Sequence, residues 1–166
     1  MSVIAIKRTK SGFDIVSDSI TTVGNTKLSE SHKGINSKLY KTNGMIIGGC
    51  GSSDVGLMRI YARRHKPSSA TSEGILDYIS EYCEWKQKKT NEYNMDAQFI
   101  ICFEGKAFSV YDNFDIQEIE DYYAIGWMEH ALAAMYLGHS ALEAVEVAIQ
   151  LSVYCYGPTV KFEVYY

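Results

Sequence analysis

Cysteine and histidine are the residues of this sequence whose side chains could bind a metal, form a disulfide or act as nucleophiles. The four cysteines lie far apart, each inside an apolar segment, and none belongs to a Cys-x-x-Cys pair: Cys50, Cys83, Cys102 and Cys155. The four histidines lie in unrelated segments and show no pairing at metal-ligand spacing: His32, His65, His130 and His139. We therefore expect four buried, reduced thiols, with no metal, disulfide or cofactor.

The charge and hydropathy of the chain argue against two classes of partner. The 166 residues carry 16 Lys and Arg against 20 Asp and Glu, a formal charge of −4. A nucleic-acid-binding protein needs a basic stripe, whereas the short run Lys86, Lys88 and Lys89 is typical of a solvated helix end. No apolar stretch approaches the roughly 20 residues of a membrane span, and the start does not read as a signal peptide. We expect one cytoplasmic domain over residues 1–166, without nucleic acid or membrane as a partner.

Two β-hairpins are predicted in the first third of the chain. The first turns at Ser11-Gly12, and the second turns around Asn43-Gly44, a dipeptide that is a strong hairpin signal between apolar runs. The polar stretch between the hairpins has its clearest turn signal at Gly24-Asn25. The strands of these hairpins are expected at residues 3–8, 13–18, 35–41 and 45–50.

After the second hairpin, the spacing of apolar residues changes to the helical period. One of Ser52, Ser53 and Asp54 is expected to cap the first helix, and Ser140 with Glu143 forms a capping box for the last one, which Gly157-Pro158 ends. Helices are expected near residues 54–64, 72–90, 127–137 and 141–156. Further strands are expected at residues 98–104, 107–111, 116–119, 122–126 and 159–166, with a third hairpin turning at Gly105-Lys106.

The order of these elements predicts the fold class. Strand hairpins alternate with pairs of helices, whereas a parallel α/β sheet would need strands and helices to alternate one by one. The order therefore indicates an α+β fold in which two antiparallel sheets pack face to face, with helices covering both outer sides.

Four blocks of residues, in order along nearly the whole chain, resemble the proteasome subunits and the bacterial ATP-dependent protease HslV, which are N-terminal-nucleophile hydrolases. The blocks are Val3 to Arg8, Val16 to Ser19 with Gly24-Asn25, Met45 to Gly51, and Ala124 to Gly126. The closing Gly157-Pro158-Thr159-Val160 is also similar to that family. The resemblance implies a four-layer αββα sandwich whose nucleophile is the first residue of the mature chain.

The resemblance also implies a set of site residues. Ser2 becomes the first residue when Met1 is removed, and its own α-amino group would accept the proton of its hydroxyl. Asp18 lies sixteen positions after Ser2 and matches the family's active-site aspartate. Lys33 is the candidate for the lysine that keeps the surroundings of the nucleophile positive, and Asp18 would hold it. Backbone N–H groups at Gly49 and Gly51 would stabilise the oxyanion of an acyl-enzyme reaction.

The sequence departs from the family at two places near the expected site. Trp127 follows Ala124-Ile125-Gly126, where active members usually place a serine that supports the N-terminal amine. Residues 152–156 include no acid, where the family has an aspartate. A bulky ring cannot accept the hydrogen bonds that those groups provide, so the amine would lose the partners that orient it.

Two functions remain open on this basis. One is an N-terminal serine peptidase that cleaves a polypeptide, and the other is a catalytically inactive subunit that forms rings or binds a partner. A different amide hydrolase on the same scaffold is a third alternative, because a fold does not fix a substrate. A closed homo-oligomer is implied by the resemblance, and the 13 tyrosines are compatible with subunit interfaces. Nothing in the sequence identifies an ATP-dependent unfoldase as a partner.

Overall fold

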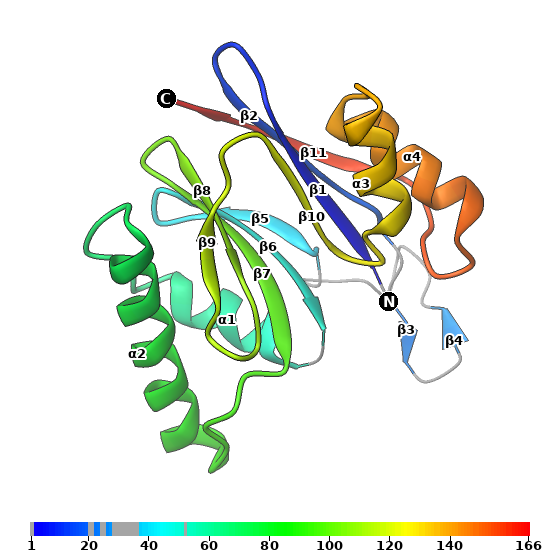
Figure 1. Ribbon diagram of the computed structural model, residues 1–166. Coiled ribbons are helices and arrows are strands. Elements are labelled where there is room, and N and C mark those ends of the chain that lie inside the picture. Colours follow the sequence, from blue (N-terminus) through cyan, green and yellow to red (C-terminus); the bar gives the residue numbers. More distant parts are fainter. Residues whose placement is uncertain (1, 20–21, 24–25, 28–36, 52) are drawn as a thin grey trace.

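Two antiparallel sheets lie face to face in the computed structural model, which describes residues 2–19, 22–23, 26–27, 37–51 and 53–166 (Figure 1). One sheet has the order β10-β1-β2-β11, with β1 at Val3–Arg8, β2 at Gly12–Ser17, β10 at Tyr122–Gly126 and β11 at Val160–Tyr165. The other has the order β5-β6-β7-β8-β9, with β5 at Leu39–Thr42, β6 at Met45–Gly51, β7 at Ala97–Phe103, β8 at Lys106–Val110 and β9 at Ile116–Glu118. The short strands β3 (Thr22–Val23) and β4 (Thr26–Lys27) pair with each other.

Two pairs of helices cover the outer sides of these sheets. The helices are α1 at Asp54–Ala62, α2 at Ser72–Thr90, α3 at Glu129–Tyr136 and α4 at Ala141–Leu151. The first two pack on the five-stranded sheet, and the last two pack on the four-stranded sheet. No helix among the described residues is long and apolar enough to cross a membrane.

Side chains alternate along β1 and so build two layers of the core. Ile4 and Ile6 point into the space between the sheets, where they pack with Ile100 of β7. Val3 and Ala5 point the other way and pack against α3 and α4. Both faces of β1 are therefore buried, which explains its unbroken apolar run. The layer order helix, sheet, sheet, helix confirms the αββα fold predicted from the sequence.

The hairpin turns follow the backbone freedom of their residues. Asn43 and Gly44 adopt positive φ angles of 49° and 79° between the paired residues Thr42 and Met45, as the sequence predicted. The third hairpin differs by one position, because Phe103 pairs with Lys106 and the turn is Glu104-Gly105, with φ angles of 48° and 77°.

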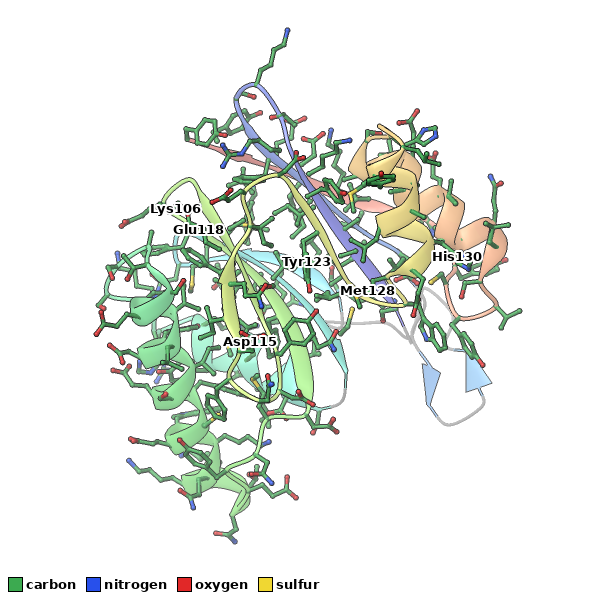
Figure 2. The ribbon with its side chains drawn as sticks, in the orientation of Figure 1. Lys106, Asp115, Glu118, Tyr123, Met128 and His130 are labelled. Carbon is green, nitrogen blue, oxygen red and sulfur yellow. The ribbon has the colours of Figure 1, made fainter. Side chains whose placement is uncertain are left out.

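Cross-strand pairing explains this shift of the turn. Lys106 already belongs to β8 and forms an ion pair with Glu118 of β9 at 3.0 Å between Nζ and Oε1 (Figure 2). On the same side of the molecule, the hydroxyl of Tyr123 on β10 hydrogen-bonds that of Tyr111, which follows β8, and so links the two sheets.

One lysine of the basic run is buried, which corrects the expectation of a solvated helix end. Lys86 is 3% exposed and its Nζ lies 2.9 Å from Oδ2 of Asp54, which also accepts the N–H of Asp96 at 2.8 Å. Lys86 follows Ile75, Ile79 and Tyr82 at helical spacing, so it falls on the buried face of α2. Lys88 and Lys89 are exposed, as predicted.

The ends of two helices also differ from their expected form. The residue before α1, Ser53, makes no side-chain capping bond, and the carboxylate of Asp54 binds Lys86 instead of capping the helix. Helix α4 has the predicted capping box at Ser140 but ends at Leu151, well before Gly157. After α4, Tyr154 stacks on Trp127.

All four cysteines are buried with free thiols, and the described residues contain no group of three His, Cys, Asp or Glu side chains that could hold a metal. Burial raises the pKa of Cys50 and Cys102 to about 12 and that of Cys83 to about 11. These thiols therefore stay protonated near neutral pH.

Candidate active site

A pocket of about 320 Å³ lies where β1 begins, beside the end of β10 and the start of β7. Its lining includes Ser2, Cys50, Gly51, Gln98, Asp112 and Trp127. The pocket therefore collects residues from the strands β6, β7 and β10, from the residue before β1 and from the loop after β8, at one end of the sandwich. Figure 2 shows Met128, which follows Trp127, at the same end of β10.

The backbone of β10 fixes the position of Ser2. Val3 pairs with Gly126, and the N–H of Trp127 donates to the carbonyl oxygen of Ser2 at 2.8 Å. Gly126 has a φ of 81°, and a Cβ atom at this position would collide with the same carbonyl oxygen. Glycine is therefore required for this approach, which places Ser2 at the edge of the pocket.

Asp18 joins three segments of the chain immediately beside Ser2. It follows β2, is 1% exposed, and its Oδ1 accepts the N–H of Val3 at 3.0 Å, while its own N–H donates to the Val3 carbonyl at 3.2 Å. Its Oδ2 accepts the N–H of Tyr156 at 3.2 Å. The carboxylate thus holds the first strand against the loop that precedes β11.

Lys38 supplies the positive charge of this cluster. Its Nζ lies 2.7 Å from Oδ1 of Asp18, and its side chain is 9% exposed. Burial lowers the pKa of Lys38 below its ordinary value, although the neighbouring Asp18 carboxylate acts in the opposite direction. The site therefore contains a buried ion pair one residue away from Ser2.

Cys50 interacts with both Ser2 and the ion pair. Its thiol is buried, and burial raises its pKa, while a hydrogen bond with the Ser2 side chain and the positive charge of Lys38 act in the opposite direction. Because the pKa is about 12, Cys50 is a neutral thiol rather than a nucleophile at neutral pH. Cys50 can orient the Ser2 hydroxyl without competing with it.

Trp127, which lines the pocket, belongs to an aromatic stack. The rings of Trp127 and Tyr154 lie 4.3 Å apart between centroids, with an interplanar angle of 13°. Trp127 stands where the sequence comparison expected a serine, and Tyr154 belongs to the run that lacks an acid. The side chains at these two positions therefore contact each other through apolar faces.

The structure brings some of the predicted site residues together. Ser2 and Gly51 line the same pocket, and Asp18 holds the residue after Ser2. The N–H of Gly49 donates to the carbonyl oxygen of Lys38 at 2.9 Å, so it is already used within the sheet. Lys33 lies outside the described residues.

Sequence reasoning missed Lys38, Cys50 and the contact of Trp127 with Tyr154. Lys38 directly precedes the apolar residues of β5, but no local pattern distinguishes it from the other lysines. Cys50 and the stack carry no separate signal, since they depend on tertiary contacts.

Comparison with known proteins identifies the fold. No protein-family model matches the chain, and no curated protein matches it by sequence. Among solved structures, it is similar to BPH from Thiobacillus denitrificans, with a TM-score of 0.83 and 18% identity over 96% of both chains. It is also similar to Anbu (ancestral beta-subunit) from Yersinia bercovieri, with a TM-score of 0.73 and 14% identity over 96% of this chain and 80% of that one.

A third similar structure is the eukaryotic HslV from Trypanosoma brucei, with a TM-score of 0.70 and 18% identity over 96% of this chain and 97% of that one. At this level of identity, the likeness establishes the fold. The chain has the fold of HslV-like proteasome subunits.

Proposed function

We propose that this chain, which has the fold of the HslV-like proteasome subunits, is an N-terminal-nucleophile peptidase in which Ser2 attacks the substrate after Met1 is removed. The observation that carries the proposal is the buried pair of Asp18 and Lys38, held on the backbone beside Ser2. A second buried pair joins Lys86 to Asp54, and what distinguishes the Asp18 pair is that Asp18 accepts the N–H of Val3, the residue after Ser2. A fixed positive charge beside a nucleophile has a chemical use.

The reaction needs no residue beyond Ser2 to move the proton. The Ser2 hydroxyl gives its proton to the Ser2 α-amino nitrogen while Oγ bonds to the carbonyl carbon of the substrate. The ammonium then returns the proton to the leaving nitrogen as the C–N bond breaks, and water hydrolyses the resulting ester by the same route. The Lys38 charge favours the neutral amine and the developing alkoxide, and Asp18 positions Lys38.

The oxyanion would be stabilised by a backbone N–H at the edge of the pocket. Gly51 is the better candidate of the two predicted glycines, because it lines the pocket while the N–H of Gly49 is bonded to Lys38. We place the reaction in the cytoplasm, where the four free thiols stay reduced.

The test of this proposal is covalent labelling of Ser2. BPH, which has the same fold, has been solved in complex with epoxomicin, so this compound is the probe. We expect intact mass spectrometry to show a chain without Met1 and, after epoxomicin, a single adduct on the peptide that begins at Ser2. Ser2→Ala should abolish the adduct, and Ser11→Ala, at the exposed β1–β2 turn, should keep it. Quantitative retention of Met1 would overturn the proposal.

A second candidate is an inactive subunit of the same fold, and the stack of Trp127 on Tyr154 favours it. The indole N–H of Trp127 only donates, so this side chain cannot accept a hydrogen bond from an N-terminal amine as a serine hydroxyl would. In that case Met1 is retained, epoxomicin leaves the mass unchanged, and Ser2→Ala has no effect on the biological activity. The labelling experiment therefore separates the two candidates directly.

We also propose that the chain associates with itself. Anbu from Pseudomonas aeruginosa, which has the same fold at a TM-score of 0.68 and 10% identity, has been solved as a helical assembly. Light scattering on the purified chain would decide the matter, and a monomer at micromolar concentration would contradict it.

A further inference from the structure

Charge is strongly segregated along this chain. Residues 107–160 contain no Lys or Arg, although the whole chain has 16 of them. Five acids of this region follow one another along β9, from the loop after β8 to the loop before β10, and all five are exposed: Asp112, Asp115, Glu118, Glu120 and Asp121. We call these five acids the acidic flank, in which Glu118 is already paired with Lys106 of β8. Figure 2 shows Asp115 and Glu118 on the side of the molecule that carries β9.

A basic surface lies near the other end strand of the same sheet. Arg59 of α1 donates to the carbonyl oxygen of Ser37 at 3.5 Å, and its guanidinium lies 4.8 Å from the centre of the Tyr40 ring on β5. The basic flank is defined as Lys41, Arg59, Arg63 and Arg64. Arg63 lies one turn after Arg59, on the same side of the helix. Among the described residues, Arg63 and Arg64 have no ion-pair partner.

The two flanks are too far apart to neutralise each other within one chain. β5 and β9 are the two end strands of the five-stranded sheet, so four inter-strand steps of about 4.8 Å, roughly 19 Å in all, separate them. This distance exceeds the Debye length of about 8 Å at physiological ionic strength. Each end strand also has one edge that no described strand pairs with.

We propose that the basic flank of one copy docks on the acidic flank of a second copy, head to tail. Opposite charges on opposite flanks favour this contact, whereas a symmetric contact would bring like charges together. Because each copy keeps one flank of each sign, the contact repeats and produces a ring or a filament. The inference rests on the self-association proposed above and names its surfaces.

The contact also reaches the candidate active site. Asp112 of the acidic flank lines the same pocket as Ser2. A second copy docked on this flank therefore lies at the rim of the pocket, and its basic residues meet a substrate that enters there. Assembly and access to Ser2 are thus coupled through Asp112.

Charge reversal within each flank tests the contact. Arg63→Glu/Arg64→Glu cancels the net charge of the basic flank, and Asp115→Lys/Glu120→Lys cancels that of the acidic flank, in which Glu118 is paired with Lys106. We expect each variant alone to be monomeric by light scattering at 150 mM salt, with an apparent Kd of association at least about tenfold higher than that of the unaltered chain. Mixed together, the two variants should assemble with each other, because the unaltered acidic flank of one meets the unaltered basic flank of the other.

The matched control changes the same charges elsewhere. Lys88→Glu/Lys89→Glu, at the exposed end of α2, should leave the assembly intact. Circular dichroism checks that each variant folds. Normal assembly of either single-flank variant, or failure of the mixture to assemble, would overturn the contact. A chain that assembles through these flanks but forms no adduct at Ser2 would refute the peptidase proposal and leave this inference standing.

Discussion

Removal of the Lys38 charge should strongly destabilise the protein. Lys38→Met leaves the Asp18 carboxylate, whose side chain is 0% exposed, without the ammonium group 2.7 Å away. The N–H groups of Val3 and Tyr156 still donate to it, but they do not replace a full charge. Removing one partner of a buried pair costs about 3–5 kcal/mol, a large part of the ~5–15 kcal/mol that stabilises a typical domain.

Urea unfolding at pH 7, followed by circular dichroism, measures this loss. With a slope of about 2 kcal/mol per molar, the midpoint should fall by roughly 2 M. Lys10→Met, which removes an exposed lysine at the β1–β2 turn, should change the free energy of unfolding by less than about 0.5 kcal/mol. The double variant Asp18→Asn/Lys38→Met should recover part of the loss, because no buried charge remains uncompensated.

A loss below about 1 kcal/mol for Lys38→Met at pH 7 would refute the idea that a buried charge pair organises this site.

Three further predictions concern other parts of the structure. Lys86→Met should lower the free energy of unfolding in urea by about 3–5 kcal/mol, because it leaves the buried Asp54 carboxylate without its positive partner. Lys88→Met, at an exposed position, should change it by less than about 0.5 kcal/mol. Gly126→Ala should destabilise the fold by at least ~1–3 kcal/mol and abolish epoxomicin labelling, because its Cβ would collide with the Ser2 carbonyl oxygen. Its control is Gly56→Ala in α1, where a Cβ has open space and should stabilise the fold by about 0.5–1 kcal/mol. Above pH 9 the free energy of unfolding should fall, since the unfolded thiol of Cys50 loses its proton there while the folded thiol, with a pKa of about 12, keeps it.

Each of these predictions has an opposite outcome that is easy to recognise. Equal losses for the two lysine variants would mean that the Asp54 pair contributes no more than a surface charge. A labelled glycine variant would mean that the backbone approach to the Ser2 carbonyl is not needed for reactivity. Rapid reaction of the native thiols with Ellman's reagent at pH 8 would contradict their burial.

The spacing of apolar residues was sufficient to predict the helix and sheet layers, because every second residue of a half-buried strand and one face of each helix must be apolar. The apolar run of β1 and the Asn43-Gly44 turn are examples, since each depends on nearby residues. The same rule also predicts the burial of Lys86, because its helical spacing from Ile79 and Tyr82 places it on the buried face of α2. A charged residue on that face requires a buried partner.

Features that depend on distant contacts were not predictable in this way. The helical spacing of apolar residues continues beyond Leu151, but α4 ends there, and Tyr154 then stacks on Trp127, which precedes α3. Lys38 was missed for a similar reason, since no local pattern states which lysine reaches Asp18 across the sheets. Such pairings are decided by the tertiary fold.

The anchoring of Ser2 by the end of β10 has a practical consequence for anyone who makes this protein. A purification tag joined ahead of Ser2 would start at the pocket, where the Trp127 N–H fixes the direction of the chain, and would add bulk at the place where a substrate must enter. The last residues lie at the far end of the same sheet, where Tyr165 pairs with Gly12 (Figure 1). A tag after Tyr166 therefore leaves the pocket accessible, and a cleavable leader that exposes Ser2 offers a way to make the free amine without cellular processing.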